Sequence, residues 1–196
     1  MISQSVMPVA FVRLRLTESY LIKMTKFSFL TLFSLMISLY GHRLTYSPEE
    51  FLVGQSKCFL LDANSSPKDK PWVWYAPTLP MIPGPSHTWY IDKLIEEGIS
   101  FAGCDQGEVR GSPASIQRFT EFYNEMVKRG YSKKPALLGQ SRGGLMMLSW
   151  AVRNPNKVGA FAGIYPVQNL RSWPIKRNLS ATLHDFEMDE KTFFQM

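Results

Sequence analysis

Short apolar runs alternate with segments of helical periodicity between about residues 71 and 165. Continuously apolar runs bounded by turn residues are typical of strands buried on both faces. The run at 136–138 is expected to be such a strand, further strands are predicted at 71–76, 99–104 and 158–164, and a weaker strand pattern covers 51–61. Helical spacing predicts helices over 88–97, after Ser112-Pro113, and from Leu145 to Val152. This alternation predicts an α/β fold, a mostly parallel sheet with helices on both faces, because parallel strands need helical crossovers.

The first 41 residues have a different pattern. Lys26 precedes 14 mostly apolar residues, 27–40, a length too short for a spanning helix but suited to the apolar core of a signal peptide. Met24 would supply the start of that peptide, and residues 1–23 would then be an upstream extension. We therefore divide the chain into a leader, 1–41, and a domain, 42–196. We predict export to the periplasm or the extracellular space, with an uncleaved membrane anchor through 27–40 or a buried helix as the alternatives.

Composition narrows the class of protein. The 196 residues fit one domain, and a hydrophobic content of 45% is enough for a core. The net charge is +6, of which the leader contributes +3, and basic residues form no cluster with aromatic ones. We therefore predict no nucleic-acid partner, and contact with a membrane only if the leader is uncleaved.

The two cysteines, Cys58 and Cys104, exclude a disulfide-dense scaffold and a multi-cysteine metal site. Each lies in an apolar run that predicts a strand. Buried free thiols are the expected state, and a bridge between the two is the alternative. No metal ion or cofactor is predicted.

The candidate chemistry lies where the strand at 136–138 gives way to a helix. Ser141 stands between Gly139 and Gly143 there, in the pattern GxSxG. A sharp turn from strand to helix exposes such a serine as a nucleophile, and flanking glycines leave space for the turn. The following helix directs its amino end toward the developing negative charge, where the Arg142 N–H would be an oxyanion donor. The alternative is a glycine-rich turn whose serine only caps a helix.

A family resemblance rests on four segments of the sequence. They are Pro71–Pro80, the group Gly107-Glu108 with Gly111-Ser112-Pro113, the segment Ser141–Leu145 that includes Gly144, and Ala162–Val167. Over residues 50–175 the chain resembles the α/β-hydrolase superfamily, in particular an exported, uncharacterised branch. The resemblance implies Ser141 as the nucleophile, the turn glycines Gly139, Gly143 and Gly144, and oxyanion donors at the backbone of Arg142 and near Leu79.

The histidine and the acid of a catalytic triad are not identified in this chain. In the superfamily both follow the serine, but the 55 residues after Ser141 hold one histidine, His184, next to Asp185. Adjacent side chains on a helix diverge by about 100°, so these two do not easily form a catalytic pair. The strand at 158–164 would also be an unpaired apolar edge, which favours a partial domain that lacks its last strands.

Two other residues are candidates for the site. His87 follows a proline-rich loop, where capping a helix is the expected role and an approach to the pocket the alternative. Glu108 follows the strand at 99–104, on the side where open α/β sheets form their sites, and is interpreted equally as a pocket or a turn residue.

The sequence therefore predicts a serine hydrolase of carboxylic esters, with amides as a second substrate class, that acts on a small molecule through an acyl-enzyme on Ser141. The alternative is a non-catalytic fragment or binding module that lacks the triad acid and histidine.

Overall fold

The computed structural model describes residues 47–64, 68–78 and 83–195. The predicted leader, 1–41, and Leu79 lie outside them. The described strands are β1 Glu49–Val53, β2 Ser56–Leu61, β3 Trp72–Thr78, β4 Ser100–Asp105, β5 Ala136–Gln140 and β6 Ala160–Ile164. The described α-helices are α2 Thr88–Glu96, α3 Pro113–Lys128, α4 Gly143–Arg153, α5 Pro174–Phe186 and α6 Glu190–Gln195.

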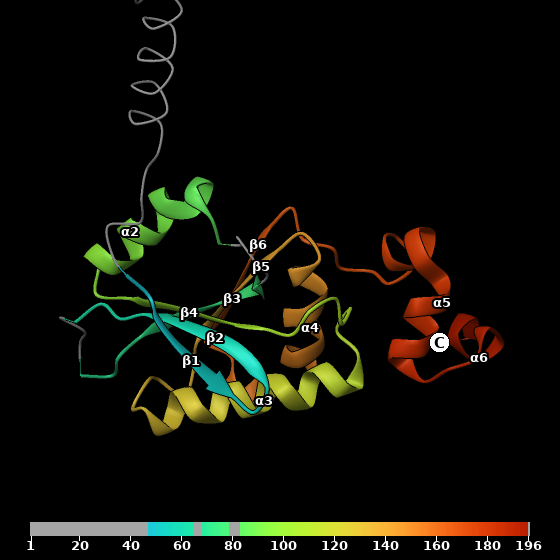
Figure 1. Ribbon diagram of the computed structural model, residues 1–196, viewed down its shortest axis with the longest axis horizontal. Helices are drawn as coiled ribbons and strands as arrows, with labels where there is room; N and C mark the ends of the chain where they lie inside the picture. Colours follow the sequence, from blue (N-terminus) through green and yellow to red (C-terminus); the bar gives the residue numbers. More distant parts are fainter. Residues whose placement is uncertain (1–46, 65–67, 79–82, 196) are drawn as a thin grey trace, which may run out of the picture. The chain divides into compact units, whose positions relative to one another are not determined.

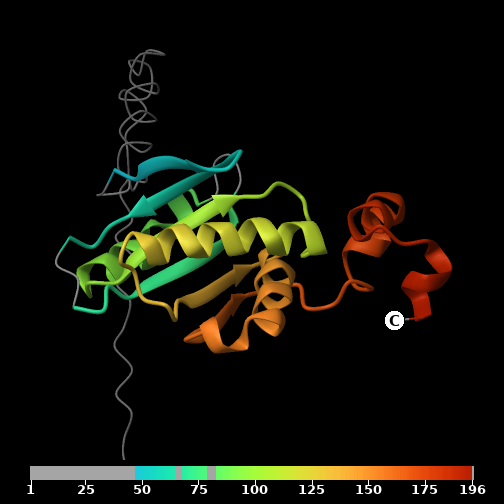
Figure 2. The ribbon, with the colours of Figure 1, turned by 90° about the horizontal axis from the view of Figure 1, so that it is seen from below.

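The strands form one mixed sheet in the order β1-β2-β4-β3-β5-β6. β4, β3, β5 and β6 are parallel, whereas β1 and β2 are antiparallel additions at one edge. Figure 2 shows this order from β1 in blue to β6 in orange. The α/β fold with a mostly parallel sheet is therefore confirmed.

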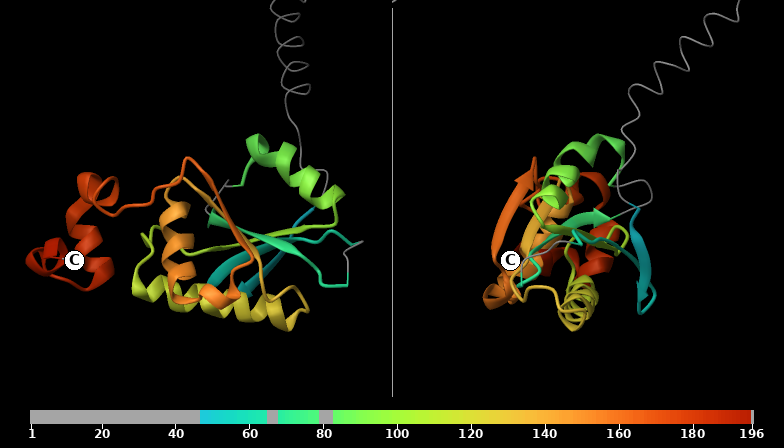
Figure 3. Two further views of the ribbon diagram at one scale, coloured as in Figure 1. Left: turned by 180° about the vertical axis from the view of Figure 1, so that it is seen from behind. Right: turned by 90° about the vertical axis from the view of Figure 1, so that its left-hand side faces the viewer.

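Helices cover both faces of the sheet, as predicted. α2 lies on one face, and α3 and α4 lie on the other (Figures 1 and 3). β3 serves both layers because successive side chains point to opposite faces. Trp72 and Trp74 join the core under α3 and α4, whereas Val73 and Tyr75 join the core under α2.

Two differences from the sequence prediction concern the strands at the edges of the sheet. The weak strand pattern over 51–61 contains two strands, because Gly54 turns the chain between them with φ at +57°. β6 begins at Ala160, since residues 155–157 form a 3₁₀ turn.

The strands also differ in how far their side chains are buried. β3 is almost fully buried, but β5 alternates between buried and half-buried residues and β6 is mostly exposed, with Phe161 at 37%. Within the described residues β6 pairs with β5 alone. No helix in the described ranges is long and apolar enough to cross a membrane.

The core under α3 and α4 depends on Trp74, which is 0% exposed. Its ring lies 4.8 Å from Trp150, 5.3 Å from Phe122 and 5.4 Å from Phe119, measured between ring centroids. We expect Trp74→Ala to lower the free energy of unfolding by about 3–5 kcal/mol because it leaves a cavity among these rings. Trp89→Ala is the matched control. Trp89 is 72% exposed, and its loss should change stability by no more than about 0.5 kcal/mol in urea titrations.

Candidate active site

Ser141 lies in the turn between β5 and α4, at the carboxyl end of the parallel strands. Its φ is +50°, in the left-handed region that residues other than glycine rarely adopt. Its N–H donates to the Ile164 carbonyl at 3.0 Å, and its carbonyl accepts from the Val167 N–H at 2.7 Å. The strained conformation is therefore held by hydrogen bonds to β6 and the segment after it.

Glycines make the sharp turn sterically feasible. A Cβ on Gly139 would lie 2.6 Å from Gly144 Cα, closer than atoms can approach without a shift. A Cβ on Gly143 would collide with the carbonyl of Ala76 on β3, and one on Gly144 would collide with Pro166. Each of the three predicted turn glycines thus occupies a close backbone approach.

The amino end of α4 faces the same turn. Arg142 is the N-cap residue, no side chain caps the helix, and no acidic residue lies in its first turn. The Arg142 N–H has no hydrogen-bond acceptor within the described part of the chain. Free N–H groups at a helix amino terminus stabilise an adjacent negative charge. The second predicted donor, near Leu79, lies outside the described residues.

Glu108 lines a cavity next to the turn. Its carboxylate forms an ion pair with the Arg142 guanidinium, whose carbon lies 5.6 Å from the centre of the Trp173 ring. These three residues and Arg110 border a cavity of about 260 Å³. Asp105, at the end of β4, accepts a hydrogen bond from the Gly107 N–H at 2.8 Å and so stabilises the turn that leads to Glu108.

His87 contacts the residue that precedes Ser141. Its Nε2 lies 2.9 Å from Gln140 Oε1, and the Gly84 N–H donates to its Nδ1 at 3.0 Å. The Gly84 carbonyl also lies 3.2 Å from Nδ1, so both ring nitrogens have polar partners. The residue is 8% exposed and forms the N-cap position of α2.

Two tyrosines complete this hydrogen-bond network, which sequence reasoning missed. The Tyr75 hydroxyl donates to Gln140 Oε1 at 2.8 Å, and Gln140 Nε2 donates to the Tyr165 hydroxyl at 2.9 Å. Burial raises the pKa of Tyr75, so its hydroxyl stays protonated and remains a donor. No local signal identifies the contact of His87 with Gln140, because 53 positions separate the two residues.

The side chains of His184 and Asp185 form no hydrogen bond or ion pair with Ser141 among the described residues. The His184 side chain is 90% exposed, and its Nδ1 lies 3.9 Å from Asp185 Oδ1. Asp185 instead forms an ion pair with Arg110. Neither histidine among the described residues hydrogen-bonds to Ser141.

Searches against protein-family models and against curated proteins find no match for this chain. Solved structures do match. The Francisella virulence factor BioJ has a TM-score of 0.51 and 13% identity over 73% of this chain and 51% of that one. A putative hydrolase from Agrobacterium vitis S4 has a TM-score of 0.48 and 17% identity over 71% of this chain and 61% of that one. A cold-adapted esterase from an Arctic intertidal metagenomic library has a TM-score of 0.44 and 13% identity over 59% and 58%.

The chain has the α/β-hydrolase fold. It covers less than two thirds of the length of each of these three structures, from 51% to 61%.

The contact of Gly143 with β3 can be tested by adding one methyl group. We expect Gly143→Ala to cost about 3 kcal/mol or more of unfolding free energy, because the Cβ meets a backbone carbonyl that cannot rotate away. Gly107→Ala is the comparison: no atom lies within 4 Å of its Cβ position, and only its φ of +67° opposes the change. That variant should lose about 1–2 kcal/mol. Equal losses in urea titrations would contradict the close approach.

The strain at Ser141 predicts an unusual order of stabilities. Ser141→Gly should be about 1 kcal/mol more stable than Ser141→Ala, because both lack the hydroxyl but only alanine keeps a Cβ at φ +50°. The same two substitutions at Ser132, whose φ is not positive, should give the opposite order because glycine gains more entropy on unfolding. Denaturation midpoints measure both pairs, and an alanine variant at least as stable as glycine at position 141 would refute the strain.

Proposed function

We propose that the protein is a serine hydrolase of carboxylic esters, with amides as a second substrate class, and that Ser141 is its nucleophile. The observation that carries the proposal is the backbone of Ser141, which has φ at +50° where β5 meets α4. A strained serine at this point of an α/β sheet is the arrangement by which such enzymes present a hydroxyl to substrate. Ser141 is half-buried, so its side chain is not sealed in the core.

The proposed reaction has two steps. Ser141 Oγ attacks the carbonyl carbon of the ester, and the Arg142 N–H donates to the oxygen that becomes negative. The bond to the alcohol then breaks, the alcohol leaves with a proton, and the acyl group remains on Ser141. Water attacks this acyl-enzyme, releases the carboxylic acid and returns the proton to Oγ.

The Glu108–Arg142 ion pair supports a positioning role for Glu108 beside this reaction. It holds the Arg142 side chain toward Trp173, along the wall of the 260 Å³ cavity. Glu108 is thus proposed as a pocket residue.

The structure assigns no general base for Ser141 among the described residues. Both ring nitrogens of His87 are engaged, Nε2 with Gln140 and Nδ1 with Gly84, and His184 extends into solvent. This observation favours the second candidate function, a binding module that keeps the pocket without the chemistry. The two candidates differ in whether the Ser141 hydroxyl is activated.

A fluorophosphonate probe distinguishes the two functions. We expect the folded protein to be labelled on Ser141, because only an activated serine displaces fluoride from phosphorus at a useful rate. Peptide mass spectrometry locates the label, and Ser141→Ala should abolish it. Ser132→Ala should keep it, since Ser132 Oγ only accepts a hydrogen bond from the Lys134 N–H.

Hydrolysis of short p-nitrophenyl esters gives a second readout. Turnover that disappears in Ser141→Ala and persists in Ser132→Ala supports the enzyme. Folded protein that is neither labelled nor active would leave the binding module as the function of this chain.

A further inference from the structure

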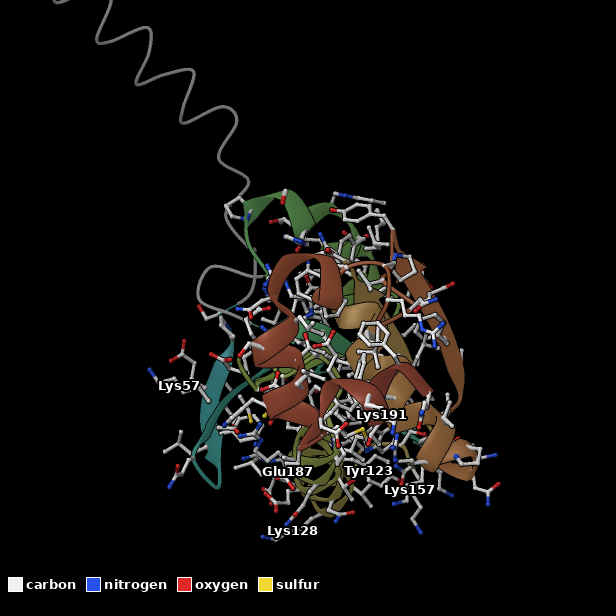
Figure 4. The ribbon with its side chains drawn as sticks, turned by 90° about the vertical axis from the view of Figure 1, so that its right-hand side faces the viewer. Lys57, Tyr123, Lys128, Lys157, Glu187 and Lys191 are labelled. Atoms are coloured by element: carbon white, nitrogen blue, oxygen red, sulfur yellow. The ribbon has the colours of Figure 1, made fainter. Side chains whose placement is uncertain are left out.

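The two cysteines of the chain lie directly opposite each other in the sheet. Cys58 on β2 is the register partner of Cys104 on β4 in an antiparallel pair. Both side chains belong to the core under α3 and are nearly buried, at 3% and 2% exposure. The two sulfur atoms are 2.9 Å apart. Lys57, the residue before Cys58, points into solvent, as the alternation along a strand requires (Figure 4).

This arrangement meets the geometric requirement for a disulfide. Directly opposite residues of antiparallel strands have Cα atoms about 4.5 or 5.5 Å apart, depending on the hydrogen-bond pattern. Disulfides join cysteines whose Cα atoms are about 4.4–6.8 Å apart. A bond between Cys58 and Cys104 therefore needs rotation of side chains but no displacement of either strand.

The surroundings of the sulfurs favour attack by Cys104. Gln106 Nε2 donates to Cys104 Sγ at 3.1 Å. Donation from the Cys58 thiol, with smaller contributions from Gln106 and Ser56, lowers the pKa of Cys104 against the opposing effect of burial. A lowered pKa increases the fraction of thiolate, which is the form that attacks a disulfide.

Gln106 lies between the pair and a cavity on the β1–β2 side of the sheet. Gln106 and Ser56, which both contact the cysteines, also line an open cavity of about 580 Å³. Gln106 Oε1 has no hydrogen-bond partner within the described residues, whereas Nε2 of the same amide donates to Cys104 Sγ at 3.1 Å and to Ser56 Oγ at 3.3 Å. Displacement of Gln106 would bring a small disulfide or the active-site loop of an oxidoreductase to Cys104.

We propose that Cys58 and Cys104 are an oxidation site at which the chain forms a cross-strand disulfide when it meets a disulfide oxidant, either glutathione disulfide or a dithiol–disulfide oxidoreductase. The Cys104 thiolate attacks one sulfur of the oxidant, whose S–S bond breaks and releases a thiolate. Cys58 then loses its proton and attacks Cys104 Sγ in the mixed disulfide, which releases the second thiol. The two cysteines lose two electrons, and the oxidant becomes two thiols that carry the two protons.

The test uses the whole chain in its folded state. Reduced protein is incubated with glutathione disulfide, denatured, treated with N-ethylmaleimide and weighed by intact mass spectrometry. We expect two maleimide adducts before oxidation and none afterwards, with the chain still monomeric on a non-reducing gel. The oxidised form should melt about 5–15 °C higher than the reduced form, because the bond constrains the unfolded chain between residues 46 positions apart.

Single substitutions provide the matched controls. Cys58→Ala and Cys104→Ala each leave one thiol, so neither should gain thermal stability on oxidation. Two adducts that persist in the folded wild-type protein, a stable mixed disulfide with glutathione, or covalent dimers would overturn the proposal. The result does not depend on the activity of Ser141, since mass and melting temperature are measured without substrate.

Discussion

The structure of the site depends on how closely the turn after β5 approaches β3. The two strands are parallel and in register up to Ala76 and Gly139, and Gly143 then lies against the Ala76 carbonyl. The Ser141 backbone is also hydrogen-bonded to Ile164 and Val167 on its other side. Backbone atoms of neighbouring segments, rather than side chains, therefore determine where the serine points. Such contacts leave little freedom, which is how a left-handed serine persists despite its conformational cost.

Most of the fold could be predicted because its signals are local. The apolar run that forms β3 is buried on both faces, and the glycine spacing around Ser141 marks the turn without knowledge of any distant residue. The prediction of strand boundaries failed where one sequence pattern covered two strands. The weak pattern over 51–61 predicts one strand, yet Gly54 reverses the chain there, and the only local signal of that turn is the polar stretch 54–57 between two apolar runs. The half-burial of Leu138 could not be predicted from the sequence either, because it depends on what packs against the α2 face of β5.

Less of the site could be predicted, because its side-chain contacts join distant parts of the chain. Glu108 and Arg142 are 34 positions apart, and the strand order that places β3 between β4 and β5 brings the ends of both β4 and β5 to one edge. The topology thus explains why Glu108 reaches the turn. His87 shows the limit of residue type as a guide: a histidine beside a candidate nucleophile suggests a base, but its two ring nitrogens are already engaged with Gly84 and Gln140.

β4 connects the candidate active site to the cysteine pair. Cys104 lies near its carboxyl end, and the loop that follows carries Gln106 and Glu108. The turn at Ser141, however, is held by β3 and β6, which do not contain a cysteine. A coupling between distant sites requires an element with two discrete arrangements that both sites influence. Because the proposed disulfide requires no displacement of either strand, β4 would not act as such an element. Oxidation should therefore change the stability of the sheet and leave the geometry of Ser141 as it is.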